Sequence, residues 1–110
     1  RLTRLTETIR ARRGADPGSS YVARLLAGGR ERVAQKVGEE AVETVIAAMR
    51  GDAKALTGEA ADLIFHLGVL LEDMGLSFED VLAELGRREG LSGVAEKAAR
   101  SRVPHPKQGD

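Results

Sequence analysis

The feature of this sequence that most constrains its fold is a pair of long segments with helical spacing of apolar residues, which meet at Gly51. The first runs from about Arg30 to Arg50. The second begins at Asp52, a residue type that caps helices, and ends near Met74. A glycine between two helices favours a reversal of the chain, so these segments predict an antiparallel helical hairpin. Apolar residues lie on more than one side of each helix, which predicts two apolar partners for each.

The rest of the sequence predicts shorter helices, and no stretch alternates as a strand would. They are expected over residues 2–13, from the cap Ser20 to Gly28 and Gly29, from a capping box at Ser77 to about residue 89, and over 92–100. The predicted fold is an all-α bundle built on the hairpin, with residues 1–100 as a single domain and 101–110 as a flexible tail. A domain of this size buries only about two thirds of its unfolded surface, so dimerisation is expected to complete the core.

Charge and composition argue against several classes of function. The chain has 17 Lys+Arg and 17 Asp+Glu and a formal net charge of zero, whereas nucleic-acid binders normally carry a basic excess. The absence of cysteine excludes disulfides, thiolate metal sites and thiol nucleophiles. No apolar run approaches the roughly 20 residues that span a bilayer, and the first residues lack the apolar core of a signal peptide. We expect a soluble, cytoplasmic protein with no nucleic-acid or membrane partner.

Four carboxylates on the hairpin form the most informative pattern. Glu40 and Glu43 are three residues apart on the first long helix, as are Glu59 and Asp62 on the second, so each pair shares a helix face. Reversal at Gly51 places Glu43 level with Glu59, and Glu40 level with Asp62. Like charges at this range repel strongly where the dielectric is low. A hard divalent cation such as Mg²⁺ would neutralise them with oxygen ligands.

An ordinary surface charge ladder is the alternative to a metal site. Lys36 precedes Glu40 by four residues and could pair with it on the helix surface. Such solvated pairs are the usual explanation for a single helix carboxylate. The register of four carboxylates on two neighbouring helices favours the metal site.

Longer motifs around these carboxylates resemble a known family. The spacing of Glu-x-x-Glu followed by Glu-x-x-Asp is similar to that of the MazG-type all-α nucleoside triphosphate pyrophosphohydrolases. Over about residues 2–88 the chain resembles the phosphoribosyl-ATP pyrophosphatase family within that group, with Val22 where many members have Thr. The segments that carry the resemblance are Ser19–Gly29, Val33–Glu43, Glu59–Leu67 and Ser77–Arg88.

The resemblance implies a reaction, a cofactor and a substrate. Members of this family hydrolyse phosphoribosyl-ATP between its α and β phosphates, giving phosphoribosyl-AMP and pyrophosphate in the second step of histidine biosynthesis. The implied cofactor is Mg²⁺, and the implied partners are this nucleotide and a second copy of the chain. The metal ligands would be Glu40, Glu43, Glu59 and Asp62.

Other residues are candidates for catalysis and substrate binding. Glu43 would serve both the metal and catalysis, and Glu39, which flanks the ligands, would orient or deprotonate the attacking water. The candidates for substrate binding are Lys36, Arg13, Arg30, Ser20, Tyr21 and His66. Their structural alternatives are a salt bridge for Lys36, surface positions for the two arginines, a helix cap for Ser20, a core edge for Tyr21 and an interior position for His66.

Two other functions stay open at this point. A MazG-type hydrolase of free nucleoside triphosphates would use the same metal chemistry. A helical dimerisation module without chemistry would leave stability independent of Mg²⁺.

Overall fold

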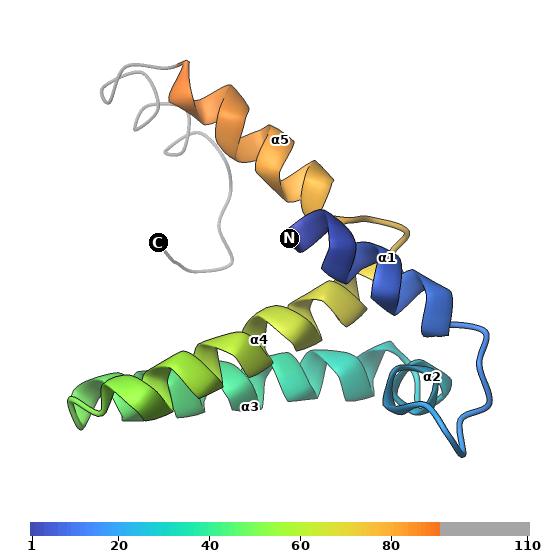
Figure 1. The fold of residues 1–110 in the computed structure, drawn as a ribbon, viewed down its shortest axis with the longest axis horizontal. Helices are drawn as coiled ribbons and strands as arrows, with labels where there is room; N and C mark the ends of the chain where they lie inside the picture. Colours follow the sequence, from blue (N-terminus) through green and yellow to red (C-terminus); the bar gives the residue numbers. More distant parts are fainter. Residues whose placement is uncertain (91–110) are drawn as a thin grey trace. The chain divides into compact units, whose positions relative to one another are not determined.

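The computed structural model describes residues 1–90, which form α-helices and no strand. It divides into two compact units, Arg1–Glu79 and a second that begins at Asp80. The helices, drawn in Figure 1, are α1 (Leu2–Arg12), α2 (Tyr21–Ala27), α3 (Arg30–Met49), α4 (Ala53–Asp73) and α5 (Phe78–Glu89). The prediction of an all-α fold is therefore confirmed. The helix expected over 92–100 and the tail over 101–110 lie outside the described residues.

Helices α3 and α4 form the predicted antiparallel hairpin and lie side by side along their lengths (Figure 1). The reversal depends on Gly51, which has a left-handed φ of 69°. The N–H of Asp52 donates to the carbonyl of Ala47 (3.2 Å), and that of Gly51 donates to the carbonyl of Ala48 (3.0 Å), so the last carbonyls of α3 are satisfied. The Asp52 side chain then accepts from the Ala55 N–H and caps α4.

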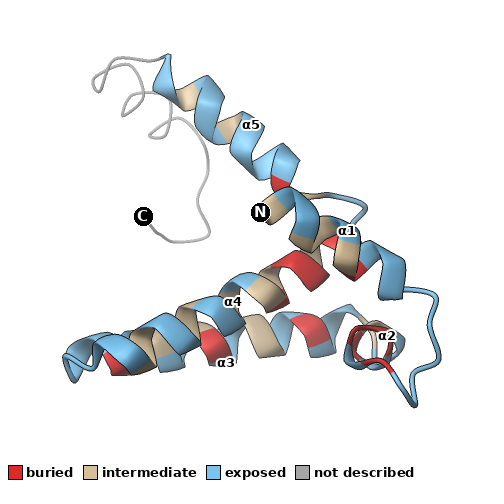
Figure 2. Ribbon diagram, viewed as in Figure 1, coloured by how far each residue is buried: buried red, intermediate tan, exposed pale blue. Residues whose placement is uncertain are grey.

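The core of the first unit lies where α1 and α2 pack against the hairpin, as the buried segments in Figure 2 show. Its buried members are Ile9, Val22, Leu25, Val33 and Val69. Helix α4 approaches its neighbours closely at Gly68. A Cβ atom there would lie 2.7 Å from Ile9 Cδ1 and 2.8 Å from Phe78 Cε2. Glycine thus allows α1 and the start of α5 to pack on α4.

An exposed apolar stripe, formed by Val42, Val45, Ile46 and Met49, follows the carboxyl-terminal half of α3. The spacing of these residues places them on one side of the helix, and Met49 is 80% exposed. Within the first unit all four side chains remain about half exposed or more. None of the described helices is both long and apolar enough to cross a membrane.

Candidate active site: an acidic cluster on the helical hairpin

Three of the four predicted carboxylates converge on the hairpin. Glu40 and Glu43 come from successive turns of α3, and Glu59 comes from the facing turn of α4. One carboxylate oxygen from each lies within 4.8 Å of the other two. Glu43 and Glu59 thus meet, as the register about Gly51 predicts. Asp62 lies one turn further along α4, is exposed and is not part of this acidic trio of Glu40, Glu43 and Glu59.

Two members of the acidic trio have buried carboxylate oxygens that no other group of the described residues compensates, whereas Glu43 is exposed. Glu40 is only 8% exposed. Its Oε1 atom and the Oε1 atom of Glu59 are buried and have no hydrogen-bond partner. Among residues 1–90, no lysine or arginine forms an ion pair with any of the three carboxylates. Buried carboxylate oxygens without partners are costly, so this arrangement calls for a cation from outside the chain.

The protonation of Glu59 reflects the same crowding. A hydrogen bond shared with Glu43 raises the pKa of Glu59 to about 6, and burial and the charges of Glu43 and Glu40 add to this rise. A bound cation would reverse the effect, because it favours the ionised carboxylates. Closely spaced oxygen donors with uncompensated charge suit a hard divalent ion such as Mg²⁺. The donor set therefore fits the predicted metal.

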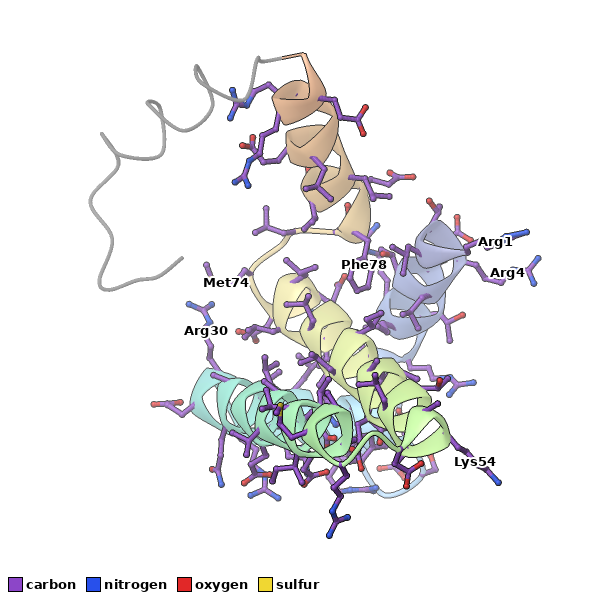
Figure 3. The ribbon with its side chains drawn as sticks, turned by 90° about the vertical axis from the view of Figure 1, so that its left-hand side faces the viewer. Arg1, Arg4, Arg30, Lys54, Met74 and Phe78 are labelled. Carbon is purple, nitrogen blue, oxygen red and sulfur yellow. The ribbon has the colours of Figure 1, made fainter. Side chains whose placement is uncertain are left out.

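Two arginines proposed as substrate ligands lie elsewhere. Arg13 Nη1 lies 2.8 Å from Glu72 Oε2, and Arg30 Nε lies 2.6 Å from Asp73 Oδ2. Figure 3 shows the side chain of Arg30, at the start of α3, on the same side of the hairpin as Met74, which follows α4. These partners follow Glu59 by 13 and 14 residues on one helix, a separation of about 20 Å. The structure does not bring either arginine to the acidic trio.

Lys36 and Glu39 pair with each other on α3. Lys36 Nζ lies 3.5 Å from Glu39 Oε1, and Gln35 Nε2 donates to Glu39 Oε2 at 2.9 Å. The hydrogen bond from Gln35, together with Lys36, lowers the pKa of Glu39. Glu39 is exposed and does not join the acidic trio. Lys36 lies one turn from Glu40, as the sequence indicates.

Tyr21 and His66 form a hydrogen-bonded chain that joins α2 to α4. His66 is 6% exposed, and its Nδ1 atom lies 2.8 Å from the carbonyl of Asp62. A carbonyl only accepts, so Nδ1 carries the proton, and Nε2 of the neutral ring accepts from the Tyr21 hydroxyl at 2.8 Å. Ser20 caps α2 by accepting from the Ala23 N–H. In the structure, therefore, His66 has an interior position and Ser20 caps a helix.

Comparison with known proteins identifies the family. A family model described as phosphoribosyl-ATP pyrophosphohydrolase matches residues 2–89. The chain belongs to the phosphoribosyl-ATP pyrophosphohydrolase family. Curated relatives named phosphoribosyl-ATP pyrophosphatase include one from Rhizorhabdus wittichii, 68% identical over 90% of this chain and 93% of that protein. Another, from Novosphingobium aromaticivorans, is 64% identical over 91% of this chain and 94% of that protein.

Membership of the phosphoribosyl-ATP pyrophosphohydrolase family confirms the resemblance predicted from the motifs. The match includes both long helices and all members of the acidic trio. The chain is therefore a hydrolase. In a hydrolase, the acidic trio has a possible chemical role, which an ordinary surface charge ladder does not have.

One residue next to Tyr21 was not predicted as a candidate from the sequence. Arg24 follows Tyr21 by three residues on α2, and its guanidinium carbon lies 5.7 Å from the centroid of the Tyr21 ring. Its Nη1 atom donates to the carbonyl of Pro17 at 2.8 Å. The three-residue spacing that brings Arg24 over Tyr21 was the available signal in the sequence.

Proposed function

We propose that this chain catalyses the Mg²⁺-dependent hydrolysis of phosphoribosyl-ATP to phosphoribosyl-AMP and pyrophosphate in the cytoplasm. The observation that carries the proposal is the pair of buried carboxylate oxygens, on Glu40 and Glu59, that lack any hydrogen-bond partner. The chain belongs to the phosphoribosyl-ATP pyrophosphohydrolase family. Its reaction is the second step of histidine biosynthesis.

The acidic trio would hold the metal. Glu40, Glu43 and Glu59 supply oxygen ligands, and Asp62, one turn along α4, is proposed as a fourth. When bound, Mg²⁺ neutralises phosphate charge and so lowers the barrier to attack by water. For binding, Glu59 must give up the proton that its raised pKa retains up to about pH 6. The site is therefore most competent above that pH.

Lys36 and Glu39 are proposed to act on the substrate and the water. Lys36 is half-buried and lies one turn from Glu40. It would break its ion pair with Glu39 and contact a phosphate oxygen of the substrate instead. Glu39 is exposed, and Gln35 and Lys36 lower its pKa further below neutral pH. Its ionised carboxylate can accept a hydrogen bond from water and orient it. Water attacks one phosphorus of the α–β anhydride, the P–O bond from that phosphorus to the bridging oxygen breaks, and the proton lost by the water is released as phosphoribosyl-AMP and pyrophosphate form.

The functional form is proposed to be a homodimer. The exposed stripe of Val42, Val45, Ile46 and Met49 follows the same helix that supplies Glu40 and Glu43. An apolar stripe of this kind is typical of a protein interface. A second copy of α3 would cover it and give each chain the second apolar partner that its periodicity predicts.

The experiment that tests the reaction compares substrates. Release of pyrophosphate is measured with phosphoribosyl-ATP, ATP and dCTP in competition, each with Mg²⁺. The proposal expects phosphoribosyl-ATP to have the highest kcat/KM. Preference for ATP or dCTP would instead support a hydrolase of free nucleoside triphosphates, and no release from any of the three would contradict hydrolysis altogether.

A further inference from the structure

The proposed substrate poses a recognition problem that the acidic trio cannot solve. Phosphoribosyl-ATP carries a phosphate monoester on a second ribose, and ATP does not. A metal bound by Glu40, Glu43 and Glu59 would contact the triphosphate, which both nucleotides share. Discrimination between them therefore needs a separate cation, at a distance from the trio that the purine and the riboses can bridge.

Helix α2 is joined to α4 two turns along the helix from Glu59. The Tyr21 hydroxyl donates to His66 Nε2, and His66 Nδ1 donates to the carbonyl of Asp62, so the start of α2 is joined to the middle of α4. His66 follows Glu59 by seven residues, or about 10 Å along the helix. Phe65 supports the arrangement, because its ring stacks on Tyr21 with a centroid separation of 6.1 Å.

Arg24 is a positively charged residue of α2 that could contact a substrate phosphate. It lies on the exposed side of α2, where the Tyr21 ring and the Pro17 carbonyl hold its guanidinium. One N–H donates to Pro17, and the others stay available for a planar, bidentate contact with phosphate.

Charge pairing distinguishes Arg24 from three other arginines of the first unit. Arg10, Arg13 and Arg30 each form an ion pair with a carboxylate of α4. Arg24 has no carboxylate partner among residues 1–90. An incoming phosphate would therefore meet a positive charge that is already oriented and not yet compensated.

We propose that Arg24 binds the phosphate of the second ribose and so selects phosphoribosyl-ATP over ATP. This inference rests on the proposed function, because it takes phosphoribosyl-ATP as the substrate. It assigns recognition to α2, whereas the proposed hydrolysis takes place at α3 and α4.

The test measures binding of two ligands to three proteins by calorimetry. The ligands are phosphoribosyl-AMP and AMP, which differ by the second ribose and its phosphate. The proteins are the wild type, Arg24→Met and the control Arg4→Met, which removes one positive charge from an arginine that points away from the hairpin (Figure 3). We expect Arg24→Met to lower the affinity for phosphoribosyl-AMP about 10- to 100-fold and to leave the affinity for AMP unchanged. Arg4→Met is expected to bind both ligands as the wild type does.

Three results would overturn the assignment. They are an unchanged affinity of Arg24→Met for phosphoribosyl-AMP, an equal loss for both ligands, and an equal loss in Arg4→Met. Circular dichroism of each variant checks that α2 is intact. Failure of the proposed function would appear separately, as a wild type that releases no pyrophosphate from phosphoribosyl-ATP.

Discussion

Arg13 Nη1 lies 2.8 Å from Glu72 Oε2 and also donates to the Glu72 carbonyl at 3.1 Å. Arg10 Nε reaches the other carboxylate oxygen of Glu72 at 3.1 Å. Glu72 is 5% exposed. Burial alone would raise the pKa of Glu72, but the hydrogen bonds from Arg13 and Arg10 outweigh it and lower the pKa. These contacts tie the end of α1 to the end of α4.

Glu72→Gln is expected to lower the free energy of unfolding by about 1–3 kcal/mol, since it removes charge-assisted hydrogen bonds from a buried acceptor. Because the folded pKa is lowered, this contribution is present in full above the ordinary glutamate pKa of 4.5 and is lost as pH falls from there through the folded pKa. Urea unfolding at pH 7 and at pH 4 measures both effects. Unchanged stability with a raised KM would instead indicate that Arg13 serves the substrate.

Gly68→Ala is expected to destabilise the protein by about 1–3 kcal/mol, because the new methyl would lie too close to Ile9 and Phe78. Gly58→Ala is the matched control on the same helix, where a Cβ meets nothing within 4 Å. It is expected to gain about 0.5–1 kcal/mol from better helix propensity. Thermal melting measures the change in melting temperature of each variant. Equal changes for the two variants would contradict the close approach at Gly68.

Local patterns in the sequence were sufficient to predict much of this molecule. The hairpin followed from helical periodicity on both sides of Gly51, and its register brought Glu43 to Glu59, because a fixed rise per residue makes heights along two antiparallel helices calculable. The positions of Arg13 and Arg30 could not be predicted this way. Their partners, Glu72 and Asp73, lie far away in the sequence, and only tertiary packing decides which carboxylate an arginine meets.

Glu59→Gln is expected to stabilise the metal-free protein at pH 7.5 relative to the wild type. The folded pKa of Glu59 is raised to about 6. The stability of the wild type therefore falls as pH rises from about 4.5 through 6. The variant has no ionisable group at this position, so its stability does not fall for this reason. Melting temperatures in EDTA at pH 4 and 7.5 measure the difference, which should vanish at pH 4. Added Mg²⁺ should then raise the melting temperature of the wild type far more than that of the variant. An equal response to Mg²⁺ would contradict a metal ligand at Glu59.

Ile46→Glu is expected to convert a dimer into monomers, because it places a charge in the exposed stripe of α3. Lys54→Gln changes the net charge by the same amount at the exposed start of α4 (Figure 3) and should stay dimeric. Light scattering coupled to gel filtration gives the mass of each protein. A monomeric wild type would contradict the proposed homodimer.

Hydrolysis of phosphoribosyl-ATP by this chain is proposed to require a Mg²⁺ ion held by the acidic trio. The most direct test measures pyrophosphate release by the wild type, Glu43→Gln and the control Glu7→Gln, which changes an exposed residue of α1, each with Mg²⁺ and with EDTA. We predict that the wild type and Glu7→Gln release pyrophosphate only with Mg²⁺, and that Glu43→Gln, although folded, loses at least 100-fold in kcat/KM, about 2.7 kcal/mol of transition-state stabilisation. Undiminished release by Glu43→Gln, or release in EDTA, would contradict a catalytic metal site at the acidic trio.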